Sequence, residues 1–136
     1  MSTDQVSTLE SRGIRTVKSG DTFAGTVSRL AAALQSHGIK IFATIDQQAE
    51  AAAVGLAMPP VTLLLFGSPK GGTPLMIAQP TSALDLPLKV VVWQSEKGEV
   101  FVTFNAAEYV IARHQLPAAL AGNIAPVEKL IAGAVG

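Results

Sequence analysis

Residues 86–104 read LPLKVVVWQSEKGEVFVTF and contain the clearest structural pattern in the chain. Segments rich in β-branched and aromatic residues, 86–94 and 100–104, lie on either side of the polar turn EKGE at 96–99. Two such segments around a short turn that contains Gly are typical of a β-hairpin. The sequence therefore predicts two antiparallel strands, and the uninterrupted apolar run within 88–93 predicts that the first is an interior strand.

Patterns typical of strands and helices alternate before this hairpin. Apolar residues recur with helical spacing between Asp21, the expected N-cap, and Gly38, where the helix is expected to end. Asp46 is the expected N-cap of an Ala-rich helix over 46–56. Strands are expected at 12–18, 39–45 and 61–66, and the last, VTLLLF, is apolar enough to predict a second interior strand.

The remaining segments predict short helices. Residues 74–78 and 80–85 are each long enough for about one or two turns. Asn105 and Glu108 have the spacing of a capping box at the start of a helix that runs through Arg113. The apolar spacing within 127–135 indicates a C-terminal helix.

Together these elements predict an α+β fold in a single domain over residues 11–136. We expect a mixed, largely antiparallel sheet with helices packed mainly on one face. The early strand–helix units favour some parallel pairing, and the hairpin adds antiparallel pairing. Residues 1–10 are expected to form a flexible polar tail.

The composition excludes several functional classes. The chain has no Cys, which rules out disulfides, thiolate catalysis and Cys-ligated metal sites. Ten basic and ten acidic residues are scattered, so no nucleic-acid-binding surface is expected. Neither a secretory signal nor an apolar run long enough to span a membrane is visible, so a cytoplasmic protein without a membrane partner is expected.

The low charge content points to an interface. Only 15% of the residues are charged and the mean hydropathy is +0.39, which favours an exposed apolar patch and therefore a homodimer. The alternative is a well-packed monomer in which Ala raises the mean hydropathy.

Residues 66–76, FGSPKGGTPLM, follow the second interior strand and suggest a binding loop. Gly67 and Gly72 have the separation of a P-loop, but Thr73 stands where that motif requires Lys, so nucleotide binding is not expected. Backbone N–H groups near the second half of the loop could still bind a small anionic ligand; the alternative is a simple strand-exit turn. The candidate ligand-binding residues here are Ser68, Lys70, Gly71, Gly72, Thr73 and Met76.

The same stretch, together with LDLPLKVVVW at 84–93, resembles the signature of the domain-of-unknown-function 302 family. That signature reads F-G-N-P-x-x-G-T-x-L-M, then L-D-L-P-L, a hairpin and a helix ending in R-H, which Arg113 and His114 match. The resemblance extends over residues 12–136. It implies a small α+β domain that tends to dimerise and has no established activity or catalytic residues.

Two positions depart from the family pattern. Ser68 replaces the usual Asn, and Gln47 replaces a His that often follows the Ile-Asp pair at 45–46. If that His carries chemistry or a metal elsewhere in the family, Gln47 cannot replace it, because Gln does not exchange protons near neutral pH.

Three further side chains, Asp46, Asp85 and His114, are candidates for acid–base chemistry at strand or helix ends. Asp46 and Asp85 are also candidates for ligand binding, although capping and turn formation are the simpler roles. No metal or cofactor is expected, since two isolated His residues are too few for a metal site. The leading hypothesis is a homodimeric, non-enzymatic small-ligand-binding or accessory module; the alternatives are a small acid–base enzyme and a pure protein-assembly domain.

Overall fold

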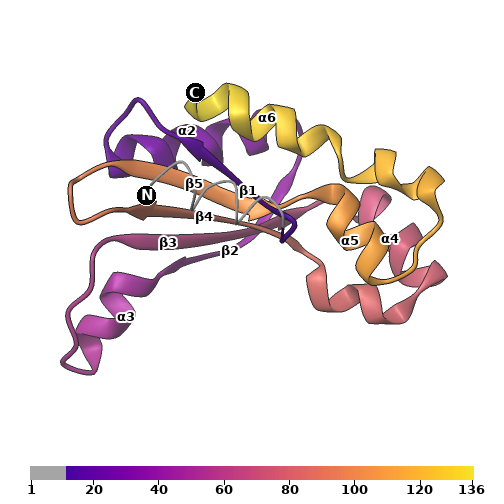
Figure 1. The fold of residues 1–136 in the computed structure, drawn as a ribbon, viewed down its shortest axis with the longest axis horizontal. Helices are drawn as coiled ribbons and strands as arrows, with labels where there is room; N and C mark the ends of the chain where they lie inside the picture. The colour runs from indigo at the N-terminus through magenta and orange to yellow at the C-terminus, as the bar shows by residue number, and fades with distance from the viewer. Residues whose placement is uncertain (1–11) are drawn as a thin grey trace.

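The computed structural model describes residues 12–136, which form a five-stranded sheet with helices at its face and ends (Figure 1). The strand order is β1-β5-β4-β3-β2, and each neighbouring pair is antiparallel. The predicted tail at 1–10 lies outside the described residues. The strands are β1 (Ile14–Lys18), β2 (Lys40–Asp46), β3 (Val61–Gly67), β4 (Leu88–Gln94) and β5 (Val100–Asn105).

This arrangement confirms the α+β class and the two interior strands, whereas the expected parallel pairing is wrong. Parallel neighbours require a crossover connection between them. Here β1 and β2 lie at opposite edges of the sheet, and β2 turns back through one short helix to pair directly with β3. The helical connections therefore change sheet edge or close a hairpin, and each strand meets its neighbours in the antiparallel sense.

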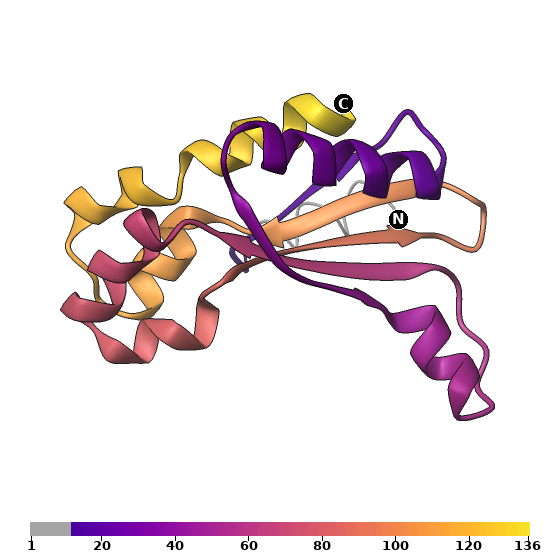
Figure 2. The same ribbon diagram turned by 180° about the vertical axis from the view of Figure 1, so that it is seen from behind.

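All helices except α3 form two groups. In one group, α2 and α6 lie side by side across one face of the sheet, as Figures 1 and 2 both show. In the other, α4, α5 and the 3₁₀ helices gather at one end of the sheet, while α3 projects from the opposite end. The bounds are α2 (Phe23–Ser36), α3 (Gln47–Ala53), α4 (Pro69–Ala78), η1 (Pro80–Asp85), α5 (Ala107–Arg113), η2 (Ala118–Asn123) and α6 (Pro126–Val135).

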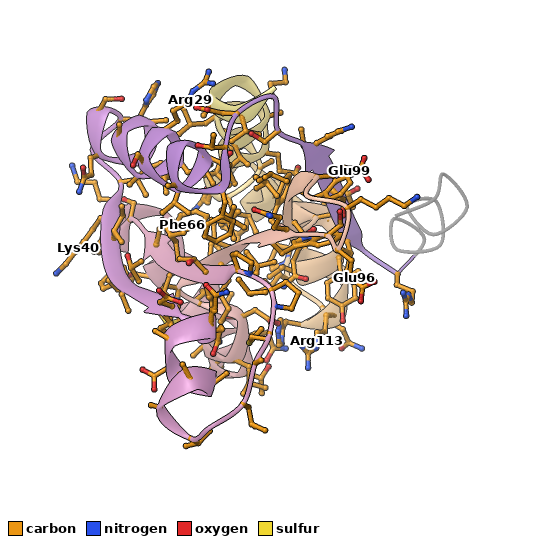
Figure 3. The ribbon with its side chains drawn as sticks, turned by 90° about the vertical axis from the view of Figure 1, so that its left-hand side faces the viewer. Arg29, Lys40, Phe66, Glu96, Glu99 and Arg113 are labelled. Atoms are coloured by element: carbon orange, nitrogen blue, oxygen red, sulfur yellow. The ribbon has the colours of Figure 1, made fainter. Side chains whose placement is uncertain are left out.

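The core lies between the sheet and the α2–α6 layer. Alternate residues of β3 point into it, and Phe66 is seen near its centre in Figure 3. On α2, the predicted apolar face delivers Leu30 and Leu34, which are almost completely buried. Strand alternation and helical spacing therefore converge on one layer, whose buried members are Leu30, Leu34, Leu64, Phe66, Val90, Val92, Val100, Val102, Phe104, Ile131 and Val135.

The opposite face of the sheet is open and largely apolar, with Lys89 and Thr103 among its polar residues. Leu63 of β3 pairs with Val91 of β4, which pairs with Thr103 of β5, and directly paired residues share a face. No helix among residues 12–136 crosses this face in Figures 1 and 2. A shallow hollow of about 150 Å³ lies on it, lined in part by these residues. The helices therefore pack mainly on one face of the sheet, as the sequence predicts.

Two predicted helix starts differ in detail. The N-cap of α2 is Thr22, whose hydroxyl accepts from the Gly25 N–H, and not Asp21. The predicted capping box at Asn105 does not form, because Glu108 pairs with Arg15 of β1 instead.

The Arg15 guanidinium joins β1 to two helices. Its Nε donates to Glu128 of α6 at 2.8 Å, and its Nη2 donates to Glu108 of α5. The hydrogen bond to Glu128 raises the pKa of Arg15 despite the opposing effect of burial. Glu108 therefore forms a long-range ion pair with Arg15 and does not cap α5, the role that its spacing from Asn105 predicts.

Residues 118–135 are long and apolar enough to span a membrane by length and composition alone. In the structure this stretch is divided into η2 and α6, and Ile131 and Val135 of α6 pack into the core. The expectation that the protein has no membrane partner remains a prediction.

Candidate functional site

The stretch FGSPKGGTPLM is mainly helical and is not the expected loop. Ser68 occupies the N-cap position and α4 begins at Pro69, since Pro suits the first position of a helix. The N–H groups of Gly71 and Gly72 both donate to the Ser68 carbonyl oxygen, at 3.0 and 2.9 Å. These two N–H groups already have partners, so the predicted backbone cradle for an anion does not form.

A pocket of about 290 Å³ nevertheless lies beside this helix. The first turns of α4, the chain that enters β4, the end of η2 and the paired strands β2 and β3 surround it. Among its described lining residues none is charged, and the surface is mainly apolar. The lining residues are Phe42, Gly67, Ser68, Pro69, Gly71, Gly72, Thr73, Met76, Leu86, Pro87, Leu88, Asn123 and Ile124.

The predicted ligand-binding residues divide into two sets. The pocket brings together Ser68, Gly71, Gly72, Thr73 and Met76, as part of its lining. The other three predicted residues, Lys70, Asp46 and Asp85, do not line it. The stretch 66–76 thus contributes to a pocket through its small and apolar groups, without its charge.

A side chain would meet different surroundings at the two glycines of α4, Gly71 and Gly72. A Cβ at Gly71 would lie 2.9 Å from the backbone oxygen of Asn123, whose side-chain amide also donates to the Gly71 carbonyl at 3.2 Å. A Cβ at Gly72 would lie 3.8 Å from the Leu86 side chain, which is an ordinary contact. Gly71 therefore permits the close approach of η2, while Gly72 leaves space in the pocket.

Replacing Gly71 by Ala should lower the free energy of unfolding by about 1–3 kcal/mol, because the added methyl overpacks the contact with η2. Replacing Gly72 by Ala should raise it by about 0.5–1 kcal/mol, because Ala is the better helix former. Urea unfolding of the two variants measures both changes. Equal changes in the two variants would contradict the contact between Gly71 and η2.

A second cluster of candidate residues lies on η1 and α5. Both carboxylate oxygens of Asp85 accept from Arg113 Nη1 at 3.1 Å, and His114 Nε2 lies 2.5 Å from Asp85 Oδ2. On the other side of the imidazole, His114 Nδ1 lies 3.2 Å from the Thr81 hydroxyl. Asp85 and His114 are both buried. Of the three acid–base candidates, the structure brings Asp85 and His114 together.

The cluster joins elements without facing the pocket. An ionised carboxylate only accepts hydrogen bonds, so His114 Nε2–H donates to Asp85, while Nδ1 lies within hydrogen-bond distance of the Thr81 hydroxyl. Asp85 borders a void of about 20 Å³, which has room for about one water molecule and no substrate. The arrangement therefore acts as a brace between η1 and α5.

Asp46 has the capping role that the sequence predicts, and it also lines an open hollow of about 420 Å³ beside α3. Its carboxylate accepts from the Ala49 N–H at 2.9 Å and caps α3. Helix α3 and the η1–α5 group lie at opposite ends of the sheet in Figures 1 and 2, so Asp46 cannot share a substrate with Asp85 and His114. Among residues 12–136, no group of three or more His, Asp or Glu side chains could hold a metal ion.

Sequence reasoning missed about half of the pocket. Leu86, Pro87 and Leu88 lie in the LDLPL stretch, whose conspicuous pattern was a usable signal. Phe42 and Asn123 had no such signal, because they come near α4 only through strand pairing and the path of η2.

Comparisons with known proteins cover most of the chain. Residues 15–135 match the model of the family described as "Domain of unknown function DUF302". Two similar relatives are "Fluoride-specific ion channel FluC 1" of Brucella suis and "Fluoride-specific ion channel FluC 2" of Brucella melitensis, each 38% identical over 104 residues, or 76% of this chain. The match covers 41% and 38% of those proteins, so the chain spans about two fifths of the length of these curated relatives.

A solved structure supports the fold. The crystal structure of an uncharacterized conserved DUF302 protein from Bacillus stearothermophilus matches with a TM-score of 0.77 and 20% identity. The match covers 90% of this chain and 95% of that one. Since the family model matches nearly the whole domain, the chain belongs to the DUF302 family.

Proposed function

We propose that this domain is a small-ligand-binding accessory module that holds a largely apolar molecule in the pocket beside α4. The observation that carries the proposal is the pocket itself, which combines a volume of about 290 Å³ with a mainly apolar lining. Small-molecule sites are typically concave and apolar, with a few polar groups that fix orientation. Here Ser68, Thr73 and Asn123 are those polar groups.

The energetics favour a ligand with an apolar body. Burial of each methylene group contributes about 0.8 kcal/mol, whereas a charged group inside this lining would lose its hydration without a paired charge. The lining contains two helix glycines together with Pro69, Pro87 and Met76. It would therefore select a ligand by its shape and apolar surface, and not by its charge. An anionic group of the ligand, as predicted from the sequence, would therefore find no cationic side chain among the described lining residues.

Replacing Gly72 by Ala tests the proposal, because it fills the pocket without harming the fold. The probe is 1-octanol, a neutral apolar molecule. We expect it to raise the melting temperature of the wild type and to shift the amide resonances of Gly67 and Gly72. In the Gly72→Ala variant, the affinity should fall about tenfold, since one methylene-sized change in an apolar pocket has this effect.

The control is Gly133→Ala in α6. A Cβ there meets nothing within 4 Å, and the substitution should stabilise a helix in the same way as Gly72→Ala. It should leave the affinity for 1-octanol unchanged. If saturating 1-octanol moves no resonance near α4 in the wild type, the pocket does not bind apolar ligands and the proposed function is wrong.

The second part of the proposal is a homodimer formed through the open face of the sheet. Its support is the apolar surface around Leu63, Val91 and Trp93, which no helix of the described chain covers. Helix α3 adds to this support: it has no buried residue, and the exposed Val54 and Leu56 follow it. Large apolar surfaces of this kind mark association sites, and a second copy is the simplest partner.

The relatives support an accessory role. Their matched segment makes up about two fifths of proteins that are named fluoride-specific ion channels. A domain that forms one part of a larger chain with a named transport activity fits a binding or sensing role beside that activity. Fluoride itself is a poor candidate for the pocket, because no cation is among its described lining residues.

A further inference from the structure

We propose that the natural ligand of the pocket is a small apolar acid, whose carboxylate lies at the rim of the pocket beside Lys40. The inference rests on the proposed ligand-binding function and adds the chemical class of the ligand. It starts from the geometry of Phe42, the residue of β2 that lines the pocket.

Phe42 reaches the pocket because β2 contains a bulge. The register pairs Ile41 with Phe66 and Ala43 with Leu65, so Phe42 has no partner of its own on β3. An extra residue in one strand changes the direction of its side chain, and bulges often serve this purpose next to binding sites. Phe42 is 45% exposed, which is unusual for a large apolar side chain held on a strand.

The ring of Phe42 lies beside Gly67, the last residue of β3. A Cβ at Gly67 would be 3.8 Å from Phe42 Cε2 and 4.0 Å from the side chain of Pro87. All three residues line the pocket. The ring therefore forms a wall where the glycine leaves space, and part of its surface faces solvent at the entrance.

Lys40 brings a positive charge to this entrance. It is the strand partner of Gly67, and its ammonium lies 5.0 Å from the centre of the Phe42 ring. Within residues 12–136 Lys40 forms no ion pair, and Figure 3 shows its side chain extending from the edge of the sheet. The charge is therefore at the rim, while the described lining inside the pocket is uncharged.

An apolar wall with a positive charge at its rim is suited to a ligand that has an apolar chain and an anionic end. An apolar chain can replace water against Phe42, Met76 and Leu86, and a carboxylate at its end can remain hydrated while it pairs with Lys40. Neither Lys40 nor Lys70 lines the pocket, but the Lys40 ammonium lies over the ring of Phe42, a lining residue, and the N–H groups of Gly71 and Gly72 are already bonded to the Ser68 carbonyl. The acid end of the ligand is thus directed outward.

The test compares octanoate with 1-octanol on the full chain, by calorimetric titration at neutral pH and low salt. Wild-type protein should bind octanoate about fivefold more tightly than 1-octanol, the contribution of one partly exposed ion pair. Added salt should remove the difference, because exposed charges are screened. In the Lys40→Gln variant the two affinities should be equal, whereas Lys97→Gln, in the hairpin turn, should keep the preference.

Phe42→Ala separates the two parts of the site. It should weaken both probes by about the same factor, roughly tenfold, because it removes an apolar wall that both ligands contact. Equal binding of octanoate and 1-octanol by the wild type, or a preference that survives in Lys40→Gln, would overturn the inference and leave the proposed function intact. Failure of both probes to bind would overturn the two together.

Discussion

Replacing Asp85 by Ala should lower the free energy of unfolding by about 3 kcal/mol, because it leaves the buried N–H donor of His114 without a hydrogen-bond partner. The carboxylate accepts from His114 at 2.5 Å and from Arg113 at 3.1 Å. His114 is 7% exposed, so without Asp85 its Nε2–H would be buried without a partner and without access to water. Most of the loss should come from His114, because the Arg113 side chain is 46% exposed and can be hydrated.

Three further variants separate this explanation from a general loss of charge. Arg113→Ala should cost less than about 1 kcal/mol, since its side chain is partly solvated. The loss for Asp85→Asn should lie between those for Asp85→Ala and Arg113→Ala, because the amide oxygen can still accept a hydrogen bond from His114. Asp46→Ala removes an exposed helix cap and should cost about 1 kcal/mol.

Urea unfolding followed by Trp93 fluorescence gives all four values. A loss for Asp85→Ala no larger than that for Asp46→Ala would contradict the brace between η1 and α5. The comparison also bears on the acid–base hypothesis. If Asp85 stabilises the fold, its presence is explained without a catalytic role.

Much of the fold could be predicted from local patterns. The hairpin at 88–105 and the face of α2 that carries Leu30 and Leu34 depend on alternation, helical spacing and turn residues within a few positions. The sheet order could not be predicted in this way, because it depends on which distant strands pair. The open face follows from that order and from the positions of α2 and α6, and no short segment encodes it.

The candidate site shows the same limit. The stretch 66–76 was conspicuous because of its glycines, and its place beside a pocket is found in the structure. Its helical conformation was missed, since glycine and proline usually predict a turn, although Pro69 suits a helix start. Phe42 entered the site through a bulge, and Asn123 through a contact with a residue 52 positions away.

Replacing Leu63 by Glu should dissociate the proposed homodimer and raise its dissociation constant at least about 100-fold, or about 2.7 kcal/mol. Leu63 lies in the row formed with Val91 and Thr103, on the face that no helix of the described residues covers. A two-fold interface repeats each contact, so one substitution places two carboxylates in it. Lys89 lines the same hollow, so each carboxylate would have one partly exposed cation nearby, which offsets only part of the hydration that it loses.

The single Trp of the chain reports this change directly. Trp93 lies on the open face, stacks on Phe101 with ring centres 4.7 Å apart and donates its Nε1–H to Thr103 at 2.9 Å. Dilution of the wild type should shift its emission to longer wavelength as the interface is exposed to water. Leu63→Glu should show the shifted emission at all concentrations, and native mass spectrometry should show a monomer.

The matched control is Ser28→Glu, which adds the same charge at an exposed position of α2 on the other side of the sheet. It should leave the dimer intact, and a circular dichroism melt of each variant should show that the monomer fold is kept. A dimer that survives Leu63→Glu would place the interface elsewhere, with α3 and its exposed Val54 and Leu56 as the next surface to change. A wild type that is monomeric at high concentration would mean that the apolar face is tolerated in water, and that the low charge content reflects Ala-rich packing instead.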